Sequence, residues 1–166
     1  MNTKENRMNR GSTLIPLVLR PGLYEFLHKM KQLYELILFS SGTTEYVNPI
    51  VDTIEKREKF FEYILYRQHC TYDENGNFFK NLDLLNRNMK NILIVDDTFK
   101  NFKYHKLNGI WIKPFFGEVR DDKNTLKILG NILAKIRHDA DMTGDIRISL
   151  SKEKNTILYS QIANKY

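Results

Sequence analysis

Cysteine is almost absent from this sequence, because Cys70 is the only one among 166 residues. A lone cysteine excludes an internal disulfide and a cysteine-based zinc site, and free thiols are typical of a reducing compartment. The histidines lie far apart and show no metal-ligand spacing; they are His28, His69, His105 and His138. The sequence therefore predicts no disulfide-stapled scaffold and no zinc site, and we expect Cys70 to be a buried apolar residue.

Long hydrophobic runs are missing too. The longest apolar stretches, residues 14–19 and 36–39, are far too short to span a bilayer. Residues 1–11 are polar and contain no signal-peptide core. We therefore expect no membrane segment in this chain.

The composition is that of one soluble domain, with 42% hydrophobic and 28% charged residues. The formal net charge is +6, but Lys and Arg are scattered rather than clustered, which gives no reason to expect direct binding of nucleic acid. The excess suits an anionic partner such as a phosphorylated protein or peptide, and a solvated basic surface would explain it equally well. Oligomeric state does not follow from these numbers.

Apolar periodicity predicts alternating strands and helices, an α/β order. Helical spacing runs over residues 22–33, 47–54 and 126–136, with Pro49 tolerated only in a first turn and Asp121 or Asp122 as the last helix's cap. Apolar runs predict strands at 13–19, 34–39, 91–96 and 109–112. Strands that are apolar on both faces are typical of parallel sheets covered by helices.

The middle of the chain, residues 60–80, has a different pattern. Aromatic and β-prone residues surround Asp73-Glu74-Asn75-Gly76, a strong turn signal. We therefore expect an antiparallel hairpin inserted into the α/β chain.

Polar residues follow two of the predicted buried strands. Ser40 and Ser41 come after the first, and Asp96 and Asp97 end the second. Ligands of open parallel sheets bind beyond the carboxyl ends of the strands, where hydroxyls and amides hold phosphate and carboxylates hold magnesium. Each pair alone could simply cap a helix, but the two together favour a phosphate and metal site.

Several motifs, in the right order, resemble the haloacid-dehalogenase-type domain shared by RNA polymerase II C-terminal-domain phosphatases and Dullard-type (NLI-interacting-factor) phosphatases. They begin with Arg-Pro-Gly-Leu-Tyr-Glu-Phe-Leu at 20–27 and Tyr-Glu-Leu-Ile-Leu-Phe-Ser-Ser at 34–41. They continue with residues 65–70, 79–82, 85–87, 92–97 and 108–110. The resemblance implies a parallel sheet flanked by helices, with the inserted hairpin, over residues 13–148. Residues 1–12 are then a flexible lead and 149–166 a loosely held polar tail.

The resemblance also implies roles, position by position. Ser40 and Lys80 take the places of catalytic residues, a hydroxyl and a cation that contact the transferring phosphoryl group. Arg67 and Ser41 match positions that bind the substrate phosphate. Asp96 and Asp97 match the acidic motif that holds Mg²⁺, although asparagine is common at the second position. Lys80 and Arg67 could otherwise be ordinary surface residues.

The nucleophile of such a phosphatase, an aspartate that forms an aspartyl-phosphate, belongs to an Asp-x-Asp-x-Thr motif at the end of the central strand. That motif should precede Arg20, where we find none, so we expect the central first strand to be missing. One literal match occurs at residues 139–143, but Asp139 and Asp141 follow a helical pattern rather than a buried strand, so we interpret the match as a coincidence. Cys70 cannot replace the nucleophile, because Gly76 stands where a cysteine phosphatase needs arginine.

Three interpretations remain for a chain without this motif. It is an incomplete form of a magnesium-dependent protein serine/threonine phosphatase, a short form that binds phosphopeptides without cleaving them, or a non-catalytic relative like the presequence translocase receptor of the mitochondrial inner membrane. The first two imply a nuclear or cytoplasmic location and the third a mitochondrial one. Loss of the central strand leaves unpaired backbone groups on both neighbours, so we expect weak stability and an inactive chain.

Overall fold

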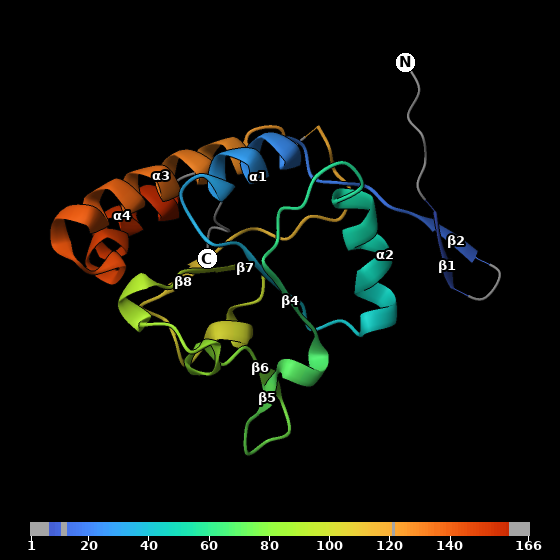
Figure 1. The fold of residues 1–166 in the computed structure, drawn as a ribbon, viewed down its shortest axis with the longest axis horizontal. Coiled ribbons are helices and arrows are strands. Elements are labelled where there is room, and N and C mark those ends of the chain that lie inside the picture. Colours follow the sequence, from blue (N-terminus) through green and yellow to red (C-terminus); the bar gives the residue numbers. More distant parts are fainter. Residues whose placement is uncertain (1–6, 11–12, 121, 160–166) are drawn as a thin grey trace.

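The computed structural model describes residues 7–10, 13–120 and 122–159. Helices and strands alternate through most of this chain, and the strands form short pairs rather than one broad sheet. In Figure 1, α1 and α3 lie together along the upper side, α4 is beside α3, α2 is on the right, and the hairpin of β1 and β2 projects outward. The helices are α1 (Leu23–Lys31), α2 (Thr44–Ile54), α3 (Thr125–Thr143) and α4 (Ile146–Tyr159).

Two parallel strand pairs form the centre of the fold. β3 (Ile37–Phe39) pairs with β4 (Tyr63–Leu65), and β7 (Ile94–Asp96) pairs with β8 (Gly109–Trp111). Two antiparallel hairpins complete the strands: β1 (Arg7–Arg10) with β2 (Thr13–Pro16), and β5 (Thr71–Tyr72) with β6 (Phe78–Phe79). The predicted α/β class and the inserted hairpin are therefore confirmed.

The β5–β6 turn shows why its sequence is a strong turn signal. The Asp73 carboxylate accepts hydrogen bonds from the backbone amides of Asn75 and Asn77, at 3.0 and 2.9 Å. Gly76 has a φ of 74°, in the left-handed region, which glycine adopts without steric cost. Side chain and backbone together close the hairpin.

The outer edges of β3 and β7 carry no partner strand in the described part of the chain. Glu62 N donates to Leu36 O and Ser40 N donates to Leu65 O, both at 2.8 Å. Because successive residues of a strand direct their backbone groups to alternate edges, Ile37 and Phe39 point theirs away from β4. This edge of the β3–β4 pair is therefore open among the described residues.

The same geometry applies to β7. Ile94 N donates to Asn108 O at 2.9 Å, and Ile112 N donates to Asp96 O at 3.1 Å, so both residues of β7 that flank Val95 face β8. Val95 therefore directs its own N–H and C=O to the open edge.

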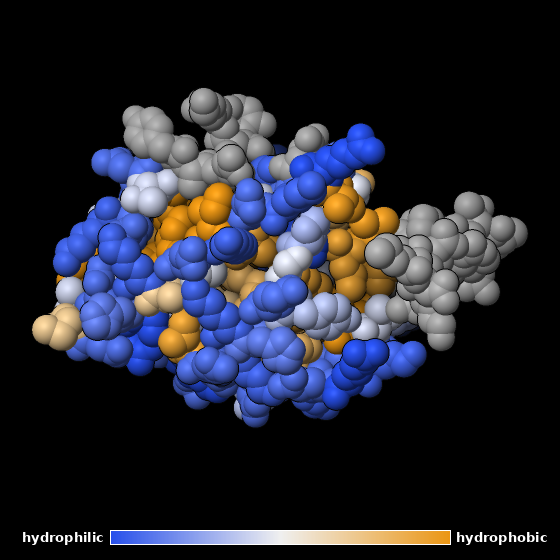
Figure 2. Space-filling view, turned by 90° about the horizontal axis from the view of Figure 1, so that it is seen from above, coloured by the Kyte–Doolittle hydropathy of each residue, from blue (hydrophilic) through white to orange (hydrophobic). Residues whose placement is uncertain are grey.

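The largest core cluster joins the helices to β8. Met30 of α1, Ile110 and the inner faces of α3 and α4 are buried together. Tyr34 fixes the entry to β3, since its hydroxyl donates to Leu133 O at 2.7 Å, and burial raises the pKa of Tyr34 to about 12. From the side of α1 and α3, polar residues cover much of the surface and apolar ones show between them (Figure 2).

The structure differs from the sequence-based expectations at both ends. Residues 7–10 of the expected flexible lead form β1. Residues 149–159 of the expected polar tail belong to α4, where Leu150 and Ile157 are buried against α3. Apolar residues spaced seven apart on α4 pack on one side, a pattern hidden by its many polar residues.

Three local expectations also change. Tyr63–Leu65, assigned to the hairpin region, forms β4 of the central pair. Pro49 lies inside α2, beyond its first turn. Asp122 is not a helix cap: it is buried, accepts a hydrogen bond from the Thr125 hydroxyl, and pairs with Arg20 at 2.6 Å. Asp121 lies outside the described residues.

Candidate functional site

The carboxyl ends of β3 and β7 meet at Lys80. Its ammonium nitrogen lies 2.5 Å from Asp96 Oδ2 at the end of β7, and 5.6 Å from the centre of the Phe39 ring at the end of β3. Lys80 and Asp96 are both buried, with 8% and 6% of their surfaces exposed. The two strand ends therefore lie close together in the structure. The sequence predicted this proximity only through the resemblance to a known family.

Asp96 is held by more than its lysine. Oδ1 accepts hydrogen bonds from Thr98 N at 2.8 Å and from the Asn101 amide at 2.9 Å. The Asn101 amide also lies 3.1 Å from Oδ2, and Asn101 O accepts a hydrogen bond from Lys80 N at 2.7 Å. Asn101 therefore fixes both members of the ion pair.

Sequence reasoning missed Asn101 and its neighbour His105. Both are buried, and His105 Nε2 accepts a hydrogen bond from Leu82 N at 3.1 Å, which anchors the chain just after Lys80. An asparagine five residues after a strand-end aspartate is a weak signal by itself. Only the turn of the short helix η4 (Phe99–Phe102) brings it back to Asp96.

The turn after β3 positions Arg67. Arg67 Nε donates to Ser41 O at 2.7 Å, and its backbone N–H donates to Gly42 O at 2.9 Å. Ser40 Oγ accepts a hydrogen bond from Gly42 N at 3.0 Å, so its own O–H is left to donate. The exposed guanidinium also lies 5.8 Å from the centre of the Phe78 ring.

Gly42 is needed for this turn. A Cβ at this position would lie 3.0 Å from a Val47 side-chain carbon and 3.2 Å from Ser40 Oγ, which is closer than normal contact. The small residue therefore lets the Ser40 hydroxyl and the start of α2 approach each other.

Cys70 is half-buried and lies beside these charges rather than in the core, so the prediction of a buried apolar residue is wrong. Burial raises the pKa of the Cys70 thiol, and the nearby cations Lys80 and Arg67 oppose this shift. Both cations are therefore near enough to this thiol to affect its pKa.

The predicted magnesium ligands are less suited to the metal than their sequence implied. Both oxygens of Asp96 already accept hydrogen bonds from Lys80, Asn101 and Thr98. Asp97 is exposed and accepts a hydrogen bond from the Thr98 hydroxyl at 3.1 Å. Over residues 7–10, 13–120 and 122–159, no three His, Cys, Asp or Glu side chains gather as a metal site. Asp96 is thus paired with Lys80, and of the two predicted ligands only Asp97 is exposed.

The literal Asp-x-Asp-x-Thr string lies at the end of α3, far along the chain from these strand ends. Asp141 pairs with Arg137 one helical turn earlier, an ordinary surface contact. Neither Asp139 nor Asp141 contacts Lys80, Arg67 or Ser40 through any hydrogen bond or ion pair of the described residues.

Among the described residues, no helix has the length and apolar character needed to span a membrane.

Comparison with known proteins gives relatives of two kinds. The chain is 36% identical over 110 residues to "CTD small phosphatase-like protein 2" of Dictyostelium discoideum, a match that covers 66% of this chain and 19% of the relative. It is 36% identical over 102 residues to "Phosphatase Herzog" of Drosophila melanogaster, covering 61% and 28%. It is 35% identical over 102 residues to "Mitochondrial import inner membrane translocase subunit TIM50" of Kluyveromyces lactis, covering 61% and 21%.

The fold is similar to that of a solved phosphatase. The structure of the fission yeast RNA polymerase II CTD phosphatase Fcp1, a point variant bound to beryllium fluoride, superposes with a TM-score of 0.55 at 21% identity. The match covers 92% of this chain and 44% of that chain. At this identity the likeness establishes the α/β fold.

The model of the family described as "NLI interacting factor-like phosphatase" matches residues 2–145. The chain belongs to this family, and it spans between 19% and 28% of the length of the three relatives named above.

Proposed function

We propose that this chain binds a phosphorylated serine or threonine of a protein partner at the Lys80 site, and that it does not hydrolyse the phosphate by itself. The observation that carries the proposal is the pair of cations at the strand ends. Lys80 has three N–H donors and uses one for Asp96, and Arg67 uses Nε for Ser41 O while its two terminal nitrogens make no hydrogen bond among the described residues.

These donors suit a phosphate group. A guanidinium with two free terminal nitrogens can bind two phosphate oxygens at once, and a buried ammonium interacts strongly with an anion. The Ser40 hydroxyl and the amides of its turn add neutral donors at the same edge. The family supports a phosphorylated partner, since the relatives include proteins named as phosphatases.

Hydrolysis through an aspartyl-phosphate requires a carboxylate that is free to attack phosphorus. Asp96 is committed to Lys80 and Asn101, and Asp97 bends back to Thr98. We therefore propose that the magnesium-dependent aspartyl-phosphate chemistry does not occur on this chain alone.

Binding can be tested by fluorescence anisotropy with a labelled phosphothreonine peptide and its unphosphorylated counterpart. We expect the phosphorylated peptide to bind more tightly, and Arg67→Gln to weaken it by about tenfold or more, because a hydrogen-bonded charge is lost. Lys127→Gln makes the same change of charge at an exposed position of α3 and should leave binding almost unchanged. Equal affinity for the two peptides would contradict the proposal.

The same protein should release no phosphate from the peptide or from a small phosphate ester, with or without Mg²⁺. Turnover would contradict the second half of the proposal. Loss of such turnover in Asp139→Asn would then identify the helical Asp-x-Asp string as the nucleophile motif.

A presequence-binding function is the second candidate, and the similarity to the TIM50 subunit favours it. Mitochondrial targeting segments are Arg-rich and poor in acids, whereas this chain itself carries a net charge of +6, so their charges repel. Tight binding of such a peptide that Arg67→Gln does not change would favour this candidate over phosphate recognition.

A further inference from the structure

A pocket of about 490 Å³ opens on one face of the β3–β4 pair. Ile37 and Phe39 of β3 lie beside Tyr63 and Leu65 of β4 in register, so these four side chains share one face and form the floor. Leu36, one residue before β3, packs instead with the core between α1 and α2. None of the four floor residues belongs to a buried core cluster of the described chain.

The pocket lining includes exposed apolar residues. Leu84 and the floor residue Tyr63 have 68% and 51% of their surfaces exposed, which is unusual for such large apolar residues. Its volume lies within the range of about 300–1,000 Å³ that is common for ligand pockets. An apolar side chain that enters here would be removed from water on several sides.

The pocket is continuous with the phosphate site. Phe39 forms part of the floor and its ring lies 5.6 Å from Lys80 Nζ. Cys70 lines the wall, three residues after Arg67, and its pKa responds to both cations. An extended peptide whose phosphate is held by Lys80 and Arg67 would therefore bring a neighbouring side chain to the pocket, since residues two apart in an extended peptide are about 6.6 Å apart.

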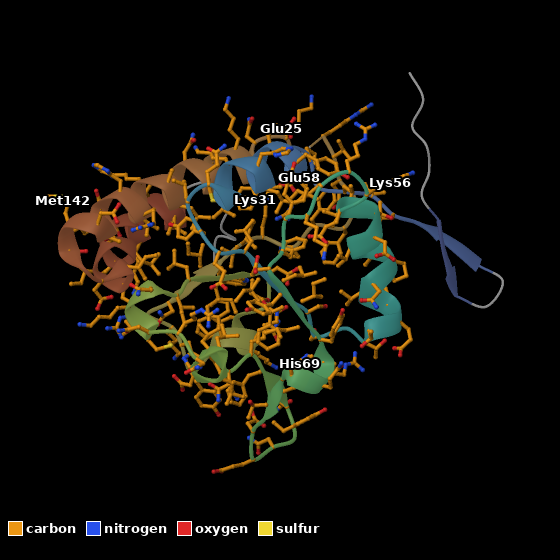
Figure 3. The ribbon with its side chains drawn as sticks, in the orientation of Figure 1. Glu25, Lys31, Lys56, Glu58, His69 and Met142 are labelled. Carbon is orange, nitrogen blue, oxygen red and sulfur yellow. The ribbon has the colours of Figure 1, made fainter. Side chains whose placement is uncertain are left out.

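The Arg87 side chain that lines the pocket is already paired. Arg87 makes two hydrogen bonds to the Glu35 carboxylate, at 3.0 and 2.8 Å. His69 Nδ1 accepts from Tyr66 N at 2.9 Å, which leaves its Nε2–H to donate to a peptide carbonyl. Figure 3 labels His69 on the short helix that follows β4, on the opposite side of the fold from Lys31 and Glu58. The pocket thus offers no unpaired charge and favours an uncharged, apolar occupant.

We propose that this pocket binds an apolar side chain, such as leucine, that lies one or two residues from the phosphorylated residue of the partner. The inference rests on the proposed phosphate recognition and adds a sequence preference to it. Phosphate provides attraction for any phosphorylated protein, and the pocket selects among them.

The test uses the full chain and a set of labelled phosphothreonine peptides with alanine at the flanking positions. Leucine replaces alanine at each position from two before to two after the phosphothreonine, one at a time. We expect one of these peptides to bind about tenfold more tightly than the all-alanine peptide, because a leucine side chain is buried. Equal affinity for all the phosphopeptides would overturn the pocket while leaving phosphate recognition in place.

A matched pair of variants locates the preference. Leu84→Ser removes an exposed apolar wall of the pocket, and Leu107→Ser removes a leucine that is 60% exposed elsewhere. Leu84→Ser should reduce the leucine preference several-fold without changing the affinity for the all-alanine phosphopeptide, and Leu107→Ser should change neither. A preference that survives Leu84→Ser overturns the assignment.

Cys70 gives an independent readout on the unmodified protein, because it is the sole cysteine. The preferred phosphopeptide should slow alkylation of Cys70 by iodoacetamide more than the all-alanine phosphopeptide or inorganic phosphate does. If the preferred phosphopeptide protects Cys70 no more than these two ligands do, the proposed role of the pocket is wrong. If the leucine peptide binds and protects Cys70 equally without its phosphate, the proposed phosphate recognition fails and the pocket stands.

Discussion

At the scale of single residues, the site depends on a buried ion pair. Lys80 and Asp96 lie 2.5 Å apart with little exposure, and Asn101 completes the hydrogen bonding of the carboxylate. Such a pair contributes little net stability when intact, because both charges have lost their hydration. Its loss is costly, since the remaining charge is buried without a partner.

We therefore expect Lys80→Met to lower the free energy of unfolding by about 3–5 kcal/mol, as is usual when a buried pair is broken. Urea unfolding followed by circular dichroism measures this change. The double variant Lys80→Met, Asp96→Asn should recover part of the loss, because it also removes the unpaired charge. Lys31→Met breaks an exposed pair with Glu58 and should change stability little. Equal effects of Lys80→Met and Lys31→Met would show that the site is solvated.

At the scale of elements, two glycines differ in whether their position requires glycine. Gly109 begins β8, and a Cβ there would overlap the ring of Phe102, which is buried to 2% exposure. Gly130 lies inside α3, where a Cβ would make ordinary contacts with Phe26, at 3.4 Å and beyond. The first glycine lets η4 pack on β8, and the second has no steric need to be glycine.

These two positions predict opposite signs for the same substitution. Gly109→Ala should destabilise the protein by about 1–3 kcal/mol through overpacking. Gly130→Ala should stabilise it by up to about 1 kcal/mol, because alanine is the better helix former. Thermal unfolding of both variants, run beside the unmodified chain, measures the difference. A stabilising Gly109→Ala would mean that Phe102 does not pack against β8.

At the scale of the whole molecule, the two parallel pairs end in open edges. The N–H groups of Ile37, Phe39 and Val95 point away from their partner strands, and no described strand covers them. Exposed edges leave backbone groups unsatisfied and invite pairing with another chain. The fold is held mainly by the helices, whose largest core cluster joins α1, α3, α4 and β8.

Hydrogen exchange followed by NMR tests this arrangement. The amides of Ile37, Phe39 and Val95 should exchange quickly, while those of Ser40, Ile94 and Ile112, which donate to Leu65, Asn108 and Asp96, should be protected. Strong protection of all six would show that another strand covers the open edges. We also expect a low free energy of unfolding, and a highly stable, cooperative monomer would contradict that expectation.

The sequence alone determined the α/β order, the inserted hairpin and the helical nature of residues 139–143. It also determined the strand before Ser40 and the strand that ends in Asp96, because periodicity and turn chemistry are local properties. Lys80, Arg67 and the two acids were assigned through ordered motifs rather than through geometry.

Only the tertiary structure decided how these residues meet. In the folded chain, Asn101 donates a hydrogen bond to Asp96, and Arg67 donates one to Ser41 O. Tyr63–Leu65 pairs with β3, and α4 packs against α3. The tertiary structure also forms the pocket that Cys70 lines, and it pairs Asp96 with Lys80. Contacts between residues far apart in the chain depend on packing, and packing has no signature in local sequence.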